Sequence, residues 1–423
     1  MLEKPKLFLN LKQFWFSMLF LSLLLIVRLY FLHVEYRNFI EKPFYFTQVK
    51  VLQSYSKTKN KKTYTVLKLY SADLNLKFFT TTFISVHKIN QKLRMKLLPN
   101  NEMSFLEYLG SSFIPSTVNE NFESEKSSKL KALKFIENQH ANELISNFYN
   151  AIFFAQTLKP NLRDQVSKLG ISHLIALSGF HLAILSGLLF FLLRPLYQFF
   201  QQRYFPYRFD LIDVGFVVLL ILAWYVWFVD APASLIRSYM MLFMGWTFLL
   251  FGVELLTLSF LSTMILLLLI IFPNLIFSLA FWFSIMGVFY IFLLLHYFSH
   301  SHKLMMTLII SFGLFLFMLP IVHMFFSIVT PLQLLSPFLS LIFTIFYPLS
   351  MLLHLLGIGD ILDSLLVQLF TMKTDENTVL ISPFITSSYF LLSFGAFYFR
   401  KLFYLLFFIA FGFFIRLFIG FLL

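Results

Sequence analysis

More than half of the chain consists of closely spaced apolar runs. From about residue 171 to the C-terminus they follow one another with few interruptions, each close to the roughly 20 residues that cross about 30 Å of hydrocarbon. A further apolar run extends from Phe14 to about Leu32. The pattern predicts membrane spans at 171–193, 211–229, 233–251, 255–271, 275–295, 304–328, 332–356, 381–398 and 402–421.

The first apolar run follows three lysines, Lys4, Lys6 and Lys12, and lacks a small-residue cleavage site at its end. It predicts a retained signal anchor within residues 1–35. Because basic residues favour the cytoplasmic side of a membrane, the N-terminus is expected in the cytoplasm. The segment that follows the anchor is then expected outside the cytoplasm.

Residues 41–115 form the sizeable stretch whose composition suits water. Apolar and polar residues alternate there with a period of two, as between Tyr64 and Tyr70, which predicts strands in a small β-barrel or sheet. The lysine-rich segment from Ser54 to Lys62 joins two of these strands, either as a solvated basic hairpin or as a ligand site. Residues 116–160 predict a helical linker or interfacial segment, and 161–423 the multi-span domain.

Composition strengthens this division. Hydrophobic residues make up 59% of the chain and charged residues only 13%, which excludes a soluble globular protein. The formal net charge of +13 predicts that the parts in water attract polyanions, such as anionic headgroups or nucleic acid. The absence of cysteine excludes disulfides, thiolate metal sites and cysteine nucleophiles.

Basic residues between the spans predict the orientation of the membrane domain. The loop with Arg194, Arg203 and Arg208 is expected in the cytoplasm, in agreement with an outer soluble domain. The same rule assigns Lys303 and Arg400 to the cytoplasm only if the weak segment at residues 361–370 also crosses or dips into the membrane. The sequence alone does not decide whether that segment crosses the membrane.

The most unusual local pattern is His173-Leu-Ile-Ala-Leu-Ser-Gly-Phe-His181, placed inside a predicted span. Ionisable residues in a span are costly unless they face protein or water, so the pattern indicates either a pore lining or helix packing. Packing is favoured by small residues at every fourth position, Gly179, Ala183 and Gly187. Two histidines eight residues apart make a weak metal site, and Ser178 lacks the flanking glycines of a nucleophile elbow.

Further polar residues interrupt the later spans. Arg237 follows Pro232 into a span, either as a cation at a channel mouth or as a snorkelling partner of Asp230. Gln333 lies in a proline-broken stretch, which a membrane tolerates best where broken helices line a cavity or are sheltered by neighbours. No nucleotide-binding fingerprint or pair of acid and base carboxylates is found, so we predict no catalytic residue, metal or cofactor.

These motifs, in this order, resemble the ComEC family of inner-membrane DNA channels of natural transformation. The first pattern, with its Ser178-Gly179 pair between two histidines, is similar to the family hallmark nearly letter for letter. Two later segments resemble the family in support: Pro232 to Met240, and Phe281 to Gly287. The likeness covers about residues 40–360.

The apolar runs, the anchor and the undecided segment together predict a polytopic α-helical membrane protein with about 10–11 spans. The resemblance implies a channel for single-stranded DNA across the bacterial inner membrane, with an OB-like extracytoplasmic domain. It places His173, Ser178, Gly179, His181, Arg237 and Gln333 along the DNA path. In the OB-like domain it implies a DNA-binding surface with Lys57, Lys59, Lys61, Lys62 and Tyr64. Implied partners are single-stranded DNA, membrane lipids, a periplasmic or surface DNA-binding competence protein and a cytoplasmic ATPase, and oligomers remain open.

Long members of the family continue into a metallo-β-lactamase-like domain, for which this sequence has no counterpart. We therefore expect no nuclease activity and do not expect an enzyme. The alternative hypothesis is a polytopic membrane enzyme or transporter that acts on lipid-linked or small anionic substrates. An essential titrating histidine at a polar midplane site would support that alternative.

Overall fold

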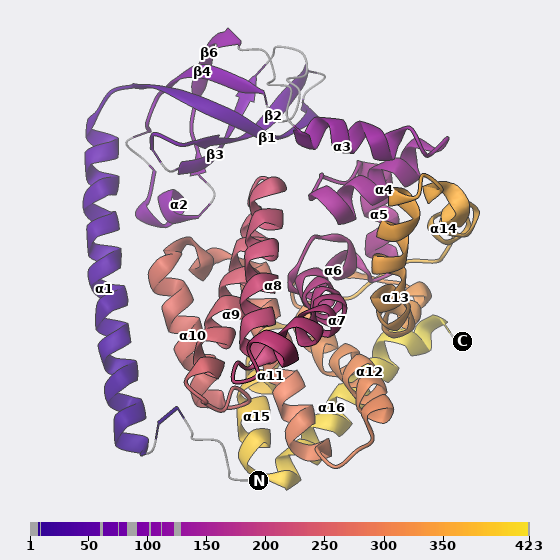
Figure 1. Cartoon of the computed structure of the whole chain (residues 1–423). Helices are drawn as coiled ribbons and strands as arrows, with labels where there is room; N and C mark the ends of the chain where they lie inside the picture. The colour runs from indigo at the N-terminus through magenta and orange to yellow at the C-terminus, as the bar shows by residue number, and fades with distance from the viewer. Residues whose placement is uncertain are drawn as a thin grey trace. The chain divides into compact units, whose positions relative to one another are not determined.

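The computed structural model describes residues 7–8, 10–59, 62–74, 76–82, 91–100, 103–110, 112–121 and 128–421, with backbone only for 53, 55–59, 62–63 and 119–121. The chain divides into two compact units (Figure 1). One comprises residues 8–130 with 262–281 and contains the main sheet. The other comprises residues 1–7, 131–261 and 282–423 and contains most of the helices.

The sheet unit begins with one long helix. The elements in chain order are α1 (Leu11–Glu41), β1 (Tyr45–Lys59), β2 (Lys62–Ser71), β3 (Leu76–Thr82), β4 (Lys92–Leu97), α2 (Phe105–Leu109), β5 (Ser112–Phe113) and β6 (Ser116–Asn121). The strands form a six-stranded sheet in the order β5-β3-β2-β1-β4-β6. All neighbouring strands are antiparallel except β3 and β5, which are parallel.

The sheet curls because of its first and last strands. β1 is 15 residues long, pairs with both β2 and β4, and carries an irregularity between Val51 and Gln53, where an extra residue bends a strand. β5 and β6 are successive pieces of one chain segment, separated by Ile114 and Pro115. Because they pair with opposite edges of the sheet, the two edges approach the same segment.

Period-two alternation explains the core of this sheet. Inward residues of the central strands are fully buried, whereas the residues between them face outward. The buried set comprises Val49, Val51, Leu67, Leu69, Phe78, Leu93, Met95 and Leu97. The buried polar residues Thr47 and Ser71 belong to the same strands. Their hydroxyls lie 2.6 Å apart, and the Thr47 hydroxyl also donates to the Asp73 carboxylate at 2.9 Å.

The helical unit is built from many short and long helices. In chain order these are α3 (Ser128–Glu137), α4 (Glu143–Phe154), α5 (Pro160–Lys168), α6 (Ser172–Ile175), α7 (Gly179–Tyr204), α8 (Asp210–Phe228), α9 (Ala233–Leu250), α10 (Leu258–Ile271), α11 (Leu279–Phe298), α12 (Lys303–Val322), α13 (Ser336–Leu355), α14 (Asp363–Phe370), α15 (Pro383–Tyr398) and α16 (Arg400–Phe418). Short 3₁₀ turns η1 (Pro273–Phe277), η2 (Pro331–Leu335), η3 (Gly359–Leu362) and η4 (Ile419–Phe421) and a two-stranded ribbon, β7 (Ile328–Val329) and β8 (Asn377–Thr378), connect them. Three of these elements, α3, α10 and α11, extend across the boundary between the units.

Eight helices in the described part of the chain are long and apolar enough to cross a membrane, which indicates a multi-pass membrane protein. They are α1, α7, α8, α9, α11, α12, α13 with its preceding turn, and α16. Two more predicted spans form shorter helices, α10 with 14 residues and α15 with 16. The polytopic helical class is therefore confirmed.

The structure differs from the sequence-based expectation in the span with the histidine pattern and in residues 116–121, which form strand β6 where a helical linker was expected, and it describes the segment left undecided. The predicted span at 171–193 is not one helix, because α6 ends after four residues and a new helix starts at Gly179. The undecided segment contains α14, whose eight residues extend only about 12 Å, too short to cross a membrane. The first difference places the histidine-containing pattern at a break between helices rather than inside one.

A buried helix lies at the centre of this unit. Nine consecutive residues of α4, from Ile145 to Phe153, are buried, and they pack in one core with residues of α5, α6, α7, α8, α13 and α14. A helix that is buried on all sides must satisfy its polar side chains internally. Asn147 does so by donating to the Thr157 carbonyl and accepting from the Lys159 N–H.

Candidate functional site

Three interrupted segments of the helical unit meet around α6. The first is the corner from Lys168 to Ser178 between α5 and α7, the second is the start of α9, and the third is η2 with the start of α13. We call this region the junction. It contains the predicted path residues His173, Ser178, Arg237 and Gln333, and the predicted Gly179 and His181 follow directly at the start of α7.

Ser178 and His181 end the break by capping α7. The Phe180 N–H donates to the Ser178 hydroxyl at 3.3 Å, and the Ser178 N–H donates to Nδ1 of His181, also at 3.3 Å. This is a capping box in which an imidazole stands where glutamate or glutamine is usual. The two residues therefore fix where the helix begins.

The capping bond also fixes the tautomer of His181. Because Nδ1 accepts a hydrogen bond, the ring proton of the neutral imidazole lies on Nε2. Nε2 is buried and has no hydrogen-bond partner among the described residues, but the ring stands nearly perpendicular to Tyr347 at 4.8 Å and to Phe343 at 5.1 Å. Edge-to-face contact with these rings is the interaction available to that N–H. His181 is fully buried and faces aromatic rings of α13, not solvent.

The start of α9 also stabilises the break between α6 and α7. The Ser234 hydroxyl donates to the Leu177 carbonyl at 2.7 Å, a carbonyl left without a helical partner by the break. A Cβ on Gly179 would lie 2.9 Å from Oγ of Ser238, so only glycine permits this approach of α7 to α9. Arg237, adjacent to Ser238, is half-buried beside this contact.

The proline-broken segment closes the junction through the backbone around Gly170. Gly170 has a left-handed φ of 67°, and a Cβ there would lie 3.2 Å from the Gln333 side chain. The Thr330 hydroxyl donates to the Lys168 carbonyl, and the Ser336 hydroxyl donates to the Gly170 carbonyl at 3.1 Å. Gln333 itself is buried and donates to the Ile328 carbonyl at 3.0 Å, so it supports the corner rather than facing solvent.

His173 is the predicted path residue that remains accessible. It lies on α6 with an exposed side chain, and a hydrogen bond links it to the backbone of Gly170. Its neighbours Ser172 and Ala176 are exposed too, whereas Leu174, Ile175 and Leu177 are buried. His173 is therefore the exposed path residue, whereas Ser178, His181 and Gln333 make contacts that hold the turn, and Arg237 is half-buried.

The predicted stripe of small residues makes only one close contact in this chain. Gly179 meets Ser238, as described above, but a Cβ on Gly187 would have nothing within 4 Å. Ala183 is exposed. The stripe thus allows one close approach at the helix start and leaves its remainder uncovered by the described residues.

A second candidate surface lies on the outer side of the sheet, across β2 and β3. The Lys68 ammonium lies 5.4 Å from the ring centre of its cross-strand partner Phe79, and Lys77 lies 5.8 Å from that of Tyr70. Phe113 continues this row onto β5 and is 52% exposed. We call these five residues the cation–aromatic face.

The two lysines of this face influence each other. Loss of hydration near the sheet lowers the pKa of Lys77, and the positive charge of Lys68 adds to that shift. A negatively charged group placed between them would relieve the repulsion. Ammonium groups beside exposed rings suit a ligand with phosphates and flat bases.

The lysines predicted for DNA binding lie where little is described. Lys61 falls outside the described residues, and only the backbone is described for Lys57, Lys59 and Lys62. Tyr64 is half-buried, and strand alternation places it on the same side of β2 as Lys68 and Tyr70. The predicted lysine-rich hairpin, Ser54 to Lys62, therefore leads directly into β2, the strand that carries Lys68 and Tyr70 of the cation–aromatic face.

The comparison with protein families decides which proteins this chain belongs with. A family model with the description Competence protein matches residues 154–422, which is more than half of the chain. The chain is a member of the competence protein family. No curated protein and no solved structure matches it.

Membership of the competence family gives this protein a role in DNA uptake. The match begins at the end of α4, so the whole junction lies within the family region. The sheet lies before it. The resemblance of the His173–His181 pattern to the ComEC family is thereby confirmed on independent grounds.

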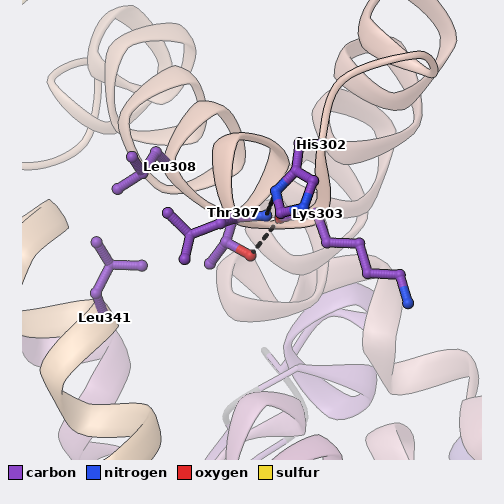
Figure 2. Close-up of a pocket in the computed structure, with 6 residues that line it drawn as sticks. His302, Lys303, Thr307, Leu308 and Leu341 are labelled. Atoms are coloured by element: carbon purple, nitrogen blue, oxygen red, sulfur yellow. Dashed lines mark hydrogen bonds between the residues drawn. The ribbon is translucent and has the colours of Figure 1, made fainter.

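An open groove of about 520 Å³ lies away from the junction in this competence protein. Figure 2 shows Leu308 of α12 and Leu341 of α13 on its sides, with His302 and Lys303 at the start of α12. His302 caps α12 by accepting from the Leu304 N–H at 3.4 Å. The groove is mostly apolar and contains none of the predicted path residues.

Sequence analysis missed several residues that build the junction of this competence protein. Ser234 and Ser238 bind or contact the break, and their spacing of four residues in an apolar helix was a readable signal of one polar face. Thr330 and Ser336 belong with Gln333 to the polar residues of the proline-broken stretch, but their partners were not predicted. The carbonyls they bind belong to a segment more than 160 residues earlier, so no local pattern indicates the pairing.

Proposed function

We propose that this competence protein conducts single-stranded DNA across the cytoplasmic membrane, with the junction as part of the path. The observation that carries the proposal is the junction itself, where three non-helical segments meet within a bundle of apolar helices. Irregular backbone is tolerated at membrane depth only where protein shelters it or water reaches it. The hydrogen bonds around α6 supply the shelter, and water reaching its exposed side is part of the proposal.

The residues of the junction suit conduction better than tight binding. A moving polyanion needs contacts that are favourable but easily exchanged. His173, the neighbouring hydroxyl of Ser172 and the half-buried Arg237 provide such contacts without a preorganised chemical site. The proposal assigns no catalytic residue and no cofactor.

The sheet is proposed to be an OB-like domain that gathers the strand outside the cytoplasm. Counting β5 and β6 as one interrupted strand gives the cyclic order β1-β2-β3-β5/β6-β4, a five-stranded curled barrel. OB-folds bind oligonucleotides over the outer side of their second and third strands. The cation–aromatic face occupies that position here and offers both ammonium groups and rings.

The orientation and partners follow from the same proposal. The N-terminus lies in the cytoplasm and the protein in the inner membrane, with the loop of Arg194, Arg203 and Arg208 on the inner side. A periplasmic or surface DNA-binding competence protein delivers the strand, and a cytoplasmic ATPase draws on it. Membrane lipids surround the helices, and oligomers are compatible with this arrangement.

The test is import of labelled DNA in cells that carry His173→Ala. We expect DNA in the cytoplasm to fall at least about tenfold, while protein level and capture of DNA at the cell surface stay normal. The control is His300→Ala, which removes an exposed histidine from the loop before α12. Equal import in both variants would contradict the proposed path. Loss of a lipid-linked or small anionic substrate activity with normal DNA import would favour the alternative transporter or enzyme.

A further inference from the structure

A buried cluster of titratable side chains lies at the end of α13 opposite the junction. Nδ1 of His140 lies 2.9 Å from each carboxylate oxygen of Asp363, and its Nε2 lies 2.9 Å from Nε2 of His354. Nδ1 of His354 in turn lies 2.6 Å from the Ser350 carbonyl. The cluster joins the turn between α3 and α4 to the corner between α13 and α14.

These partners fix the number of protons. A carbonyl only accepts, so His354 carries a proton on Nδ1, and its Nε2 must accept from Nε2–H of His140. The remaining contact joins Nδ1 of His140 to Asp363. It needs one proton, held either as an imidazolium beside a carboxylate or as a carboxylic acid that donates to neutral imidazole. The geometry thus requires one shared proton between His140 and Asp363.

Any other proton count breaks a contact. If the shared proton leaves, the carboxylate either faces a bare ring nitrogen or takes the proton from the bond between the two histidines. If a proton is added to His354, its Nε2–H faces the Nε2–H of His140. Buried polar groups that lose partners are costly, so both changes oppose docking of the two corners.

The surroundings isolate the cluster from water except at one point. The His140 side chain is fully buried, and Asp363 retains 20% exposure. From α4, the Tyr149 ring stacks on His140 at 4.8 Å, while burial and the Asp363 charge raise the pKa of its phenol well above the usual range. The other charged groups of these elements are Lys129, Lys131, Lys134 and Glu137 of α3, Glu143 of α4 and the exposed Asp360 of η3. Glu137 accepts from Asn150, and Glu143 pairs with Lys159.

A neutral contact binds the same two corners. Gln139 donates to the His354 carbonyl at 3.1 Å and accepts from the Gly359 N–H at 3.0 Å. These bonds report on docking without depending on protonation. At its other end, α13 begins with Ser336 in the junction, so the helix extends from one polar site to the other.

We propose that His140, His354 and Asp363 form a one-proton site that docks the α3–α4 corner onto the α13–α14 corner over a limited pH window. The proton reaches the site through Asp363. This inference goes beyond DNA conduction and does not depend on it.

Hydrogen exchange of the full-length protein in lipid nanodiscs, measured from about pH 5 to about pH 9, tests the site. After correction for intrinsic exchange rates, we expect the peptides containing Gln139 and Gly359 to be most protected at intermediate pH. Asp363→Asn should remove the alkaline loss of protection, because its amide donates to Nδ1 of His140 and has no proton to lose. Asp360→Asn is the matched control and should keep the wild-type profile.

Two results would overturn the proposal. One is a wild-type profile that stays flat across the whole range. The other is an Asp363→Asn profile that loses protection on the alkaline side as the wild type does. The wild-type measurement decides the question even if the variant does not fold, and import of DNA is not part of the readout.

Discussion

The cation–aromatic face and the junction use polar residues in opposite ways. On the face, Lys68, Lys77 and their partner rings point outward from a sheet whose core needs none of them. In the junction, most polar side chains form hydrogen bonds within the protein. Ser234 and Ser336, for example, donate to backbone carbonyls left free by a helix break. Among the polar side chains of the junction, those of Ser172 and His173 on α6 remain exposed.

The difference separates two kinds of function. A surface whose charges are not needed for folding can lose one side chain and keep its shape, so its substitutions should change affinity alone. A site whose polar groups hold the backbone should show coupled losses of structure and function. The predictions below test this distinction, in order of decreasing effect.

The largest effect is expected for Gly179→Leu in the junction. A side chain there meets Ser238 within contact distance and would push α7 away from α9. DNA import should fall at least about tenfold, and the protein level should fall with it. Gly187→Leu changes the same residue type in the same helix, where a Cβ meets nothing within 4 Å. Similar losses of import and protein level in both variants would contradict a specific role of the close contact between Gly179 and Ser238.

On the sheet, Tyr70→Ala or Phe79→Ala should weaken binding of single-stranded DNA without loss of folded protein. Stacking of a base on an aromatic side chain contributes about 1–3 kcal/mol, so each variant should bind about 5–150 times more weakly. Fluorescence anisotropy with a labelled oligonucleotide and the full-length protein measures this. Phe46→Ala, an exposed ring on the β1–β4 side, is the control and should bind as the wild type.

His181→Ala should lower stability by about 0.5–2 kcal/mol, the usual range for loss of a helix cap. His181→Gln retains an acceptor for the Ser178 N–H, as in an ordinary capping box, and should recover much of the loss. Thermal unfolding of the purified protein in detergent compares the two. If both variants unfold as the wild type but lose DNA import, His181 acts on DNA directly and the distinction fails at this residue.

The smallest effect is expected for the double variant Lys68→Gln, Lys77→Gln. Each phosphate contact with single-stranded DNA contributes about 0.7 to the slope of log affinity against log salt, so the slope should decrease by about 1.4. Lys96→Gln on β4 should change it less. Binding by the wild type should also weaken as pH rises, because Lys77, with its lowered pKa, loses its charge earlier than an ordinary lysine.

Hydropathy predicted most helices of the membrane domain because each apolar run must be long enough for the bilayer. It could not predict the break before Gly179, since Ser-Gly also occurs inside transmembrane helices and histidine is an unusual capping partner. The break depends on Ser234 and Ser336, which are distant in sequence. Only the fold brings them to it.

In the sheet, alternation predicted β1, β2 and β3. The Lys-Leu-Arg-Met-Lys-Leu run of β4 alternates in the same way but was not predicted as a strand. Alternation also implies that one of Phe78 and Phe79 faces inward, but it does not say which. The register with β2 and β5 decides it, since Phe78 is buried with Leu69 while Phe79 lies beside Lys68. Such cross-strand partners cannot be read from one strand alone.

The interrupted strand at Pro115 has a mechanical consequence. β5 is paired with β3 over only two residues, whereas β6 is paired with β4 over five. Under tension the seam with the fewest hydrogen bonds yields first, so a pull on this segment should open the sheet between β3 and β5. Phe79 and Phe113 lie at that seam, so the ring surface is also the part of the sheet most sensitive to force.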